Sequence, residues 1–357
     1  MPIAVNGRFL AQRVTGVQRF AGEVARQFDA MAAEGLLPGA RLLRPPGGPP
    51  SPFPHLREEV FGRLPGQGWE QAELPRRLGG DVLVSLGNTA PLLAGRRQAV
   101  VIHDAGAFDT PESYSLAFRS WYRALHLALP RAGARLVTVS EFSRGRIAHH
   151  LRLPEERIGV MPEGAEHILR APADAAVLAR HGLAPGGYAL VVGNPAAHKN
   201  LAALADCAGL LQARGLVMAV VGAADPNVFR AGGAASGPGV AALGRVSDAE
   251  LRALYEAARC LLFPSRYEGF GLPPLEAMAC GCPVIAARAG AVPEVCHDAA
   301  IWFGQENGQD LPAMLVRLLE EEGLSDTLRA RGLARAARFT WRGAAERLLA
   351  LLPEAAR

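Results

Sequence analysis

The chain has 357 residues, of which half are hydrophobic, and it carries a formal net charge of +4 at pH 7. This length is enough for two well-filled hydrophobic cores, so we expect two domains. The basic residues are spread along the chain, which favours anionic partners only weakly and gives no support to nucleic-acid binding. No apolar stretch approaches the roughly 20 residues that a membrane-spanning helix needs, which argues against an integral membrane protein.

The first residues lack the basic region and the apolar run of a secretory signal, and we expect a cytoplasmic protein. The five cysteines form an odd set without a Cys-x-x-Cys pair, which predicts buried free thiols in a reducing compartment.

In the first half, short apolar runs alternate with helical stretches, as in βαβ units that form a parallel sheet. The candidate strands are 3–5, 81–85, 99–102, 136–139 and 158–160. The stretch 42–68 is rich in Pro and Gly and is interpreted as a long loop. Gly16 opens a helix with apolar positions at Val17, Phe20, Val24 and Phe28, and Thr15 and Gln18 fit a capping box.

The second half repeats this alternation, with candidate strands at 188–193, 216–222, 240–243, 260–263, 283–286 and 300–303. Two prolines and a glycine in 162–172 suit an interdomain link, which places the domains at 1–170 and 171–339. A helix at about 340–357 has a pattern compatible with a return to the first domain. The predicted class is α/β, with two Rossmann-like domains whose parallel sheets face a central ligand cleft.

The segment from Phe263 to Ala279 carries the strongest functional pattern, because it runs from the end of a strand through a Gly-rich loop into a helix. Pro273 and Pro274 suit the first turn of that helix, where a missing N–H is tolerated. The helix start favours an anionic phosphate, cradled by Gly269, Phe270, Gly271 and Leu272.

Two carboxylates accompany this loop, Glu268 before the helix and Glu276 within its first turns. Each carboxylate can accept hydrogen bonds from a pair of hydroxyls, one pair on a sugar and one on a ribose. The alternative is a capped surface helix with solvated glutamates, which the ordered run of strand, loop and helix start disfavours.

This segment resembles the Glu-x7-Glu motif of retaining family 4 glycosyltransferases, which have the twin-Rossmann GT-B fold. Gly193-Asn-Pro-Ala-Ala-His-Lys199-Asn-Leu resembles the loop that supplies a phosphate-binding lysine, and Val101-Ile-His103-Asp resembles the strand end whose histidine faces the donor sugar. Asn6-Gly-Arg8, Gly16-Val-Gln-Arg19, Thr138-Val-Ser-Glu-Phe-Ser143 and Gly244-Arg-Val246-Ser-Asp also agree with the family.

The resemblance implies that residues 1–170 form the acceptor-side domain and residues 171–339 the nucleotide-sugar-binding domain. It also implies that Glu268, His103 and Lys199 take part in catalysis. It implies that the donor is bound by Gly16, Arg19, Asn194, Lys199, Val246, Gly269, Phe270, Gly271, Leu272 and Glu276. The residues themselves suggest that Lys199 opens a helix at 200–214 and directs its cation at a pyrophosphate. A second basic residue, common in the family's lysine loop, is absent from 194–197, which leaves Arg19 or Arg266 as candidates. For His103, a contact to the donor and a capping hydrogen bond are equally compatible with its place at a strand end.

No Asp-x-Asp dyad and no spacing typical of metal ligands occurs, so we expect neither a metal nor another cofactor. The family implies retention of the anomeric configuration. A resemblance to bacterial mannosyltransferases of polysaccharide assembly is carried by Gly16-Val-Gln-Arg19 together with His198-Lys199-Asn200. We therefore expect GDP-mannose as the donor, ahead of UDP-glucose and UDP-N-acetylglucosamine.

We expect the acceptor to be a glycan or a lipid-linked saccharide. The basic and aromatic stretch 115–135 is compatible with a peripheral membrane contact, and also with a helix that buries one face. A GT-B-like sugar-nucleotide epimerase and a non-catalytic nucleotide-sugar-binding protein remain as alternatives.

Overall fold

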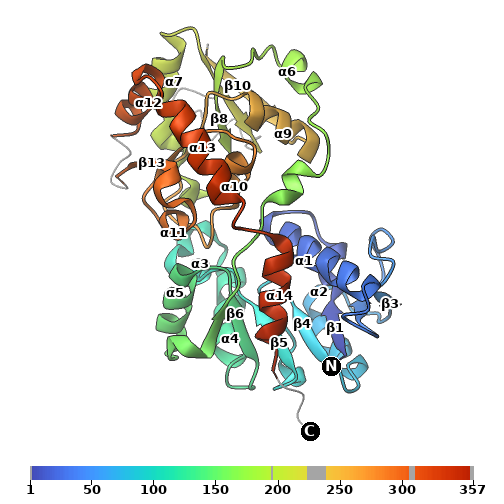
Figure 1. Cartoon of the computed structure of the whole chain (residues 1–357). Helices are drawn as coiled ribbons and strands as arrows, with labels where there is room; N and C mark the ends of the chain where they lie inside the picture. The colour runs from blue at the N-terminus through green and yellow to red at the C-terminus, as the bar shows by residue number, and fades with distance from the viewer. Residues whose placement is uncertain (1, 194–195, 223–238, 305–309, 354–357) are drawn as a thin grey trace. The chain divides into compact units, whose positions relative to one another are not determined.

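The computed structural model describes residues 2–193, 196–222, 239–304 and 310–353. The chain divides into two compact units, which we call unit 1 (Met1–Glu163 with Trp341–Arg357) and unit 2 (Gly164–Thr340). Each unit contains one parallel sheet, and the predicted α/β class is confirmed (Figure 1).

The sheet of unit 1 has the strand order β3-β2-β1-β4-β5-β6-β7, and every neighbouring pair is parallel. The strands are β1 (Ile3–Asn6), β2 (Arg41–Arg44), β3 (Arg57–Val60), β4 (Val82–Ser85), β5 (Gln98–Val101), β6 (Arg135–Thr138) and β7 (Ile158–Val160). The central strands are buried on both faces, which explains why they read as continuous apolar runs. The order reverses between β1 and β4, and ligands of such sheets bind outside the strand ends at this switch point.

Among the described residues of unit 1, six α-helices accompany this sheet: α1 (Gly16–Ala33), α2 (Gly66–Gly68), α3 (Gly106–Asp109), α4 (Leu116–Ala128), α5 (Glu141–Leu151) and α14 (Trp341–Ala350). The capping box of Thr15 and Gln18 starts α1, as predicted. Trp341 is fully buried and packs its ring against Phe20 of α1, with 5.8 Å between the ring centroids. The last helix therefore lies beside α1, although the residues before it belong to unit 2 (Figure 1).

The interpretation of 42–68 as one long loop is wrong, because this stretch contains most of β2 and all of β3. Strand β3 lies at the edge of the sheet, and its sequence Arg-Glu-Glu-Val is mostly exposed. An ion pair of 3.3 Å joins Arg41 of β2 to Glu59 of β3. Such an edge strand lacks the apolar pattern used for prediction, and its pairing with a neighbour decides its structure.

The sheet of unit 2 has the order β10-β9-β8-β11-β12-β13, again with parallel neighbours. Its strands are β8 (Tyr188–Val192), β9 (Val217–Val221), β10 (Val240–Gly244), β11 (Cys260–Phe263), β12 (Val284–Ala287) and β13 (Ala300–Phe303). The helices of the described part are α6 (Ala176–Arg180), α7 (Ala205–Gln212), α9 (Asp248–Ala257), α10 (Leu272–Ala279), α11 (Val292–Cys296), α12 (Leu311–Glu320) and α13 (Leu324–Ala336). The switch point of this sheet lies between β8 and β11.

The helix expected at 200–214 begins later than predicted. Lys199 ends a short 3-10 turn, and Asn200 adopts a left-handed conformation with φ of 52°. The Asn200 amide donates to the Pro264 carbonyl at 3.3 Å, which anchors this break. A second 3-10 turn follows, and α7 starts only at Ala205.

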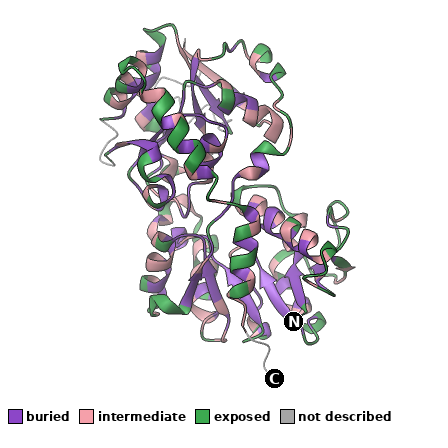
Figure 2. Cartoon of the chain, viewed as in Figure 1, coloured by how far each residue is buried: buried purple, intermediate pink, exposed green. Residues whose placement is uncertain are grey.

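The division between the units falls after Glu163 and not at residue 170. Residues Glu166–Leu169 form a 3-10 turn whose His167 and Ile168 are buried, so most of the expected link packs within unit 2. Both sheets lie in the buried interior of their units (Figure 2). The five cysteines are free and buried, as predicted. Within the described ranges, no helix has the length and apolar character needed to cross a membrane.

Candidate active site

The switch point of unit 2 brings together two of the predicted catalytic residues. Lys199 follows β8 and Glu268 follows β11, the two strands that flank the reversal of strand order. The Lys199 Nζ atom donates to Glu268 Oε1 at 2.6 Å, and the two side chains are 16% and 13% exposed. The ammonium also lies 5.7 Å from the centre of the Phe263 ring. Lys199 is the only lysine in the sequence.

Backbone contacts hold this ion pair in place from two sides. The Arg266 N–H donates to the His198 carbonyl at 2.7 Å, which ties the loop after β11 to the loop after β8. The Ala291 N–H donates to the Glu268 carbonyl at 3.0 Å, and a Cβ atom at Gly290 would lie only 2.5 Å from that carbonyl oxygen. The site is therefore preorganised by its supporting loops.

The start of α10 lies directly after Glu268. Gly271 caps this helix with φ of 113°, a conformation that favours glycine. Pro273 and Pro274 have no N–H, and the Leu275 N–H donates to the Gly271 carbonyl at 3.3 Å. Leu272 thus retains the N–H of the first turn that can meet an anion, alongside the positive end of the helix dipole.

Phe270 has a structural role within the same loop. Its ring is buried and packs edge-to-face against Phe339, with 5.9 Å between the centroids. A contribution of Phe270 to a ligand would therefore come from its backbone.

Glu276 lies in α10 but is only 6% exposed, and both of its carboxylate oxygens have protein partners. His167 Nε2 lies 2.9 Å from Oε1, and the Tyr255 hydroxyl donates to Oε2 at 3.1 Å. Burial, followed by the charge of Glu276, raises the pKa of Tyr255 well above its usual value, so the hydroxyl keeps its proton. A contact between Glu276 and a ribose stays a prediction, and it would use the remaining lone pairs of these oxygens.

Sequence reasoning missed both partners of Glu276. His167 lies in the segment interpreted as an interdomain link, 109 positions before the glutamate. Tyr255 lies on α9, and nothing in its local pattern indicates a buried carboxylate nearby.

Two further predicted donor residues are less informative. Val246 is half-buried and precedes the capping box of α9, formed by Ser247 and Glu250, so capping accounts for Ser247 in this segment. Asn194 lies outside the described residues.

In unit 1, His103 follows β5 and is buried. Its Nε2 atom lies 3.0 Å from the Leu86 carbonyl, which can only accept, so this nitrogen carries a hydrogen. The Nδ1 atom lies 3.5 Å from a carboxylate oxygen of Glu163, a residue that sequence reasoning did not select. The role of His103 at the donor sugar stays a prediction.

Gly16 and Arg19 lie in the first turn of α1, whose Phe20 contacts the His103 ring edge-on at 4.5 Å. Gly16 is exposed, and a Cβ atom there would meet nothing within 4 Å. Arg19 is half-buried. Both residues belong to the helix whose Phe20 contacts His103, and their contact to a donor stays a prediction.

No group of three or more His, Cys, Asp or Glu side chains is placed to hold a metal ion in the described part of the chain. Metal independence stays a prediction. It rests on the Lys199 ammonium and the start of α10, which together would offset the charge of a diphosphate.

Comparison with known proteins identifies the family. The family described as Glycosyl transferases group 1 matches residues 187–321. The chain is 33% identical over 256 residues to the O-antigen chain mannosyltransferase B of Escherichia coli, covering 69% of this chain and 67% of that protein.

Solved structures agree with the fold. WaaG, a glycosyltransferase involved in lipopolysaccharide biosynthesis, superimposes with a TM-score of 0.72 and 16% identity, covering 99% of both chains. HepE of Anabaena, in complex with UDP and glucose, gives a TM-score of 0.72 and 19% identity over 98% of both chains. At these identities the likeness shows the fold alone. The chain therefore belongs to the group 1 glycosyltransferases and has the GT-B fold.

Proposed function

We propose that this chain is a retaining transferase that moves mannose from GDP-mannose to a glycan or a lipid-linked saccharide. The observation that carries the proposal is the Lys199–Glu268 ion pair at the switch point of unit 2, beside the start of α10. The similarity to an O-antigen chain mannosyltransferase supports mannose as the transferred sugar.

The charges of this site suit a leaving nucleoside diphosphate. The ammonium of Lys199 and the positive end of α10 stabilise the negative charge that develops when the anomeric carbon separates from the diphosphate oxygen. This is the task that a divalent cation performs in other transferases, so the proposed reaction needs no metal.

Glu268 serves the donor sugar in this proposal. Its Oε1 atom is engaged by Lys199, and its Oε2 atom accepts hydrogen bonds from sugar hydroxyls. Glu276 accepts from the ribose, and His103 contacts the transferred hexose. The acceptor hydroxyl attacks the face that the diphosphate leaves, a new glycosidic bond forms, and the hydroxyl proton passes to the leaving phosphate oxygen.

A cytoplasmic location with peripheral membrane contact is part of the proposal. Leu116 and Trp121 of α4 are 68% and 40% exposed, and arginines lie between and beside them in the sequence. Exposed apolar side chains on a helix that also carries arginines suit the surface of an anionic membrane, where a lipid-linked acceptor would be found.

The first test is calorimetric titration of the full chain with GDP, UDP and ADP, with and without EDTA. We expect the tightest binding for GDP and no effect of EDTA. Incubation with GDP-mannose and α-linked mannobiose should then lengthen the saccharide, with an α-linkage visible in the anomeric NMR signals.

Other outcomes distinguish the alternatives. Preference for UDP would move the donor to glucose or an N-acetylhexosamine. Conversion of the nucleotide sugar without an acceptor would indicate an epimerase, and binding without any turnover would indicate a binding protein. An inverted product or a metal requirement would contradict the proposed mechanism.

A further inference from the structure

Unit 1 contains a cavity of about 780 Å³ at the end of its sheet that lies opposite to the strand end of His103. Arg97, which directly precedes β5, lines this cavity, as do Arg135, the first residue of β6, and Arg157, which directly precedes β7. The cavity therefore lies where these three strands begin. Open α/β sheets bind their ligands at the carboxyl ends of the strands, so the fold does not account for this cavity.

The lining of the cavity is strongly basic. It consists of two prolines, two alanines, one glycine and the five arginines Arg96, Arg97, Arg131, Arg135 and Arg157. We call it the arginine cavity. Among the described residues, no carboxylate lines it, and none of the five arginines forms an ion pair. Of the nearby glutamates, Glu155 is paired with Arg144 at 3.3 Å, and Glu156 is exposed outside the lining.

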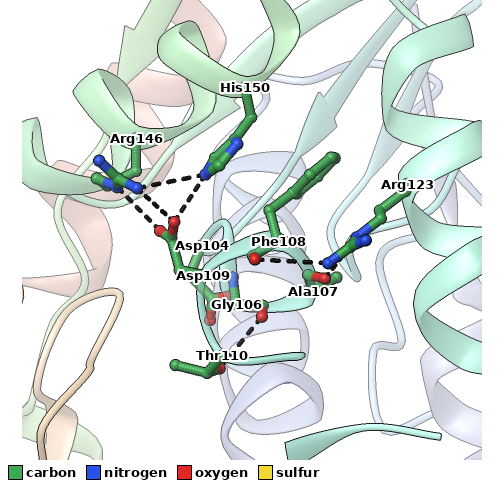
Figure 3. A network of polar contacts seen from close by, with 9 residues as sticks. All are labelled: Asp104, Gly106, Ala107, Phe108, Asp109, Thr110, Arg123, Arg146 and His150. Atoms are coloured by element: carbon green, nitrogen blue, oxygen red, sulfur yellow. Dashed lines mark hydrogen bonds and ion pairs between the residues drawn. The ribbon is translucent and has the colours of Figure 1, made fainter. Parts of the chain in front are cut away.

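Arginines elsewhere in unit 1 have fixed partners. Arg146 of α5 donates from Nε to Asp109 at 2.9 Å, and Arg123 of α4 donates to the Ala107 carbonyl at 2.8 Å (Figure 3). His150 completes this network, with its Nε2 atom 2.7 Å from Asp109. The arginine cavity contains no counterpart of Asp109 within the described part of the chain, so its positive charge is not compensated there.

Backbone carbonyls orient two of the exposed guanidinium groups. Arg97 Nη1 donates to the Gly79 carbonyl, and Arg131 Nη1 donates to the Leu127 carbonyl. A guanidinium group has five N–H donors, and a single carbonyl contact leaves most of them available to a ligand.

Two further contacts shape the wall. Arg135 is half-buried, and its Nη1 atom donates to the Arg157 carbonyl at 3.3 Å, which joins the starts of β6 and β7. Gly133 has φ of 94°, and a Cβ atom there would lie 2.6 Å from Cγ of Arg96. Glycine thus permits the backbone turn before β6 and the close approach of the Arg96 side chain. The fold gathers arginines from three separate segments around one hollow.

This arrangement suits an anion that carries several phosphoryl groups. Like charges around one hollow repel one another, and a bound anion offsets that repulsion. The planar guanidinium group matches the oxygens of a phosphate in a bidentate contact. One phosphate group carries about two negative charges at pH 7, so five arginines exceed the charge of a single phosphate.

The other lining residues argue against a membrane surface as the occupant. Leu116 and Trp121, the exposed apolar residues proposed to contact a membrane, do not line the arginine cavity. Its uncharged residues are alanine, glycine and proline. Membrane-surface sites combine basic residues with large apolar side chains, whereas sites for small molecules are concave and have volumes of about 300–1,000 Å³.

We propose that the arginine cavity binds a soluble anion with two or more phosphoryl groups, such as an oligophosphate. The inference does not rest on the proposed function, because it uses none of the residues assigned to catalysis or donor binding. It adds to unit 1 a second ligand site, at the opposite end of the sheet from His103.

The test is calorimetric titration of the full chain with inorganic triphosphate at low ionic strength. In a double variant, Arg131→Gln with Arg157→Gln, we expect the affinity to fall about tenfold, because two exposed charged contacts are lost. Both side chains are exposed, so the substitutions should leave the fold intact. The matched control, Arg57→Gln with Arg76→Gln, removes the same charge from exposed residues of unit 1 outside the lining, and it should match the parent chain.

A Lys199→Ala variant separates the arginine cavity from the donor site. Triphosphate binding that persists in Lys199→Ala and weakens in the arginine double variant would support the inference, even in a chain that transfers no sugar. Binding that is lost in Lys199→Ala and unchanged in the double variant would place triphosphate at the donor site and overturn the inference.

Two other results would also overturn it. The first is an equal triphosphate affinity of the double variant and its matched control. The second is sedimentation with phosphatidylglycerol vesicles that depends on Arg131 and Arg157 in a chain that binds no triphosphate, because the occupant would then be a membrane surface.

Discussion

Replacing Lys199 by alanine tests the charge arrangement of the donor site most directly. The ammonium makes a 2.6 Å hydrogen bond to Glu268, and both side chains are mostly shielded from water. A charge-assisted contact to a diphosphate contributes about 1.5–3 kcal/mol, which corresponds to a loss of GDP affinity of about 10–150-fold. We expect the upper part of this range, because the substitution also leaves the Glu268 carboxylate unpaired beside the diphosphate.

Calorimetric titration with GDP measures this loss, and two further variants show its origin. Lys199→Arg keeps the charge on a bulkier group and should lie between the parent chain and the alanine variant. Combining Lys199→Ala with Glu268→Gln removes both charges, so it should regain part of the lost affinity. A double variant that binds no better than Lys199→Ala would show that repulsion by Glu268 does not contribute.

The single lysine allows an independent observation. Reductive methylation with ¹³C-formaldehyde labels only Lys199 and the chain's amino terminus, and it keeps their charge. We expect the Lys199 methyl signal to shift during titration with GDP. Unchanged GDP affinity in Lys199→Ala, together with an unmoved signal, would refute the assignment of this lysine to the diphosphate.

Three other predictions address the carboxylates and a buried histidine. Glu268→Gln should lower the transfer rate from GDP-mannose about a hundredfold without weakening GDP binding, because the neutral side chain leaves Lys199 available to the diphosphate; normal initial rates would remove this carboxylate from the mechanism. Tyr255→Phe should lower the free energy of unfolding by about 1.5–3 kcal/mol in urea titrations, because Glu276 loses a buried donor, and a change below about 0.5 kcal/mol would contradict that contact. Burial lowers the pKa of His126 in the folded chain below its usual 6.5, so the unfolded chain binds the proton more readily. The free energy of unfolding should therefore fall as the pH drops below about 6.5, until the pH reaches the pKa of the folded state. His126→Gln should show a smaller loss of stability between about pH 7.5 and 5.5, and an identical pH profile would show that His126 does not contribute.

Sequence reasoning worked where a local pattern carries the structure. The central strands are continuous apolar runs because both of their faces are buried, and eleven strands were placed on that basis. The start of α10 follows from Gly271 and two prolines, and the start of α1 from the capping box of Thr15 and Gln18, since these devices act within a few residues.

The tertiary structure decided what depends on distant partners. Strand β3 has no apolar pattern. At the edge of the sheet, backbone pairing with β2 is enough to make this segment a strand. The sequence alone placed Lys199 and Glu268 at strand ends, but their 2.6 Å contact follows from the strand order, which brings two loops 69 residues apart to one switch point. The motif that contains Glu276 was recognisable in the sequence, but the burial of this side chain between His167 and Tyr255 was not. Its burial depends on packing between segments that no local pattern connects.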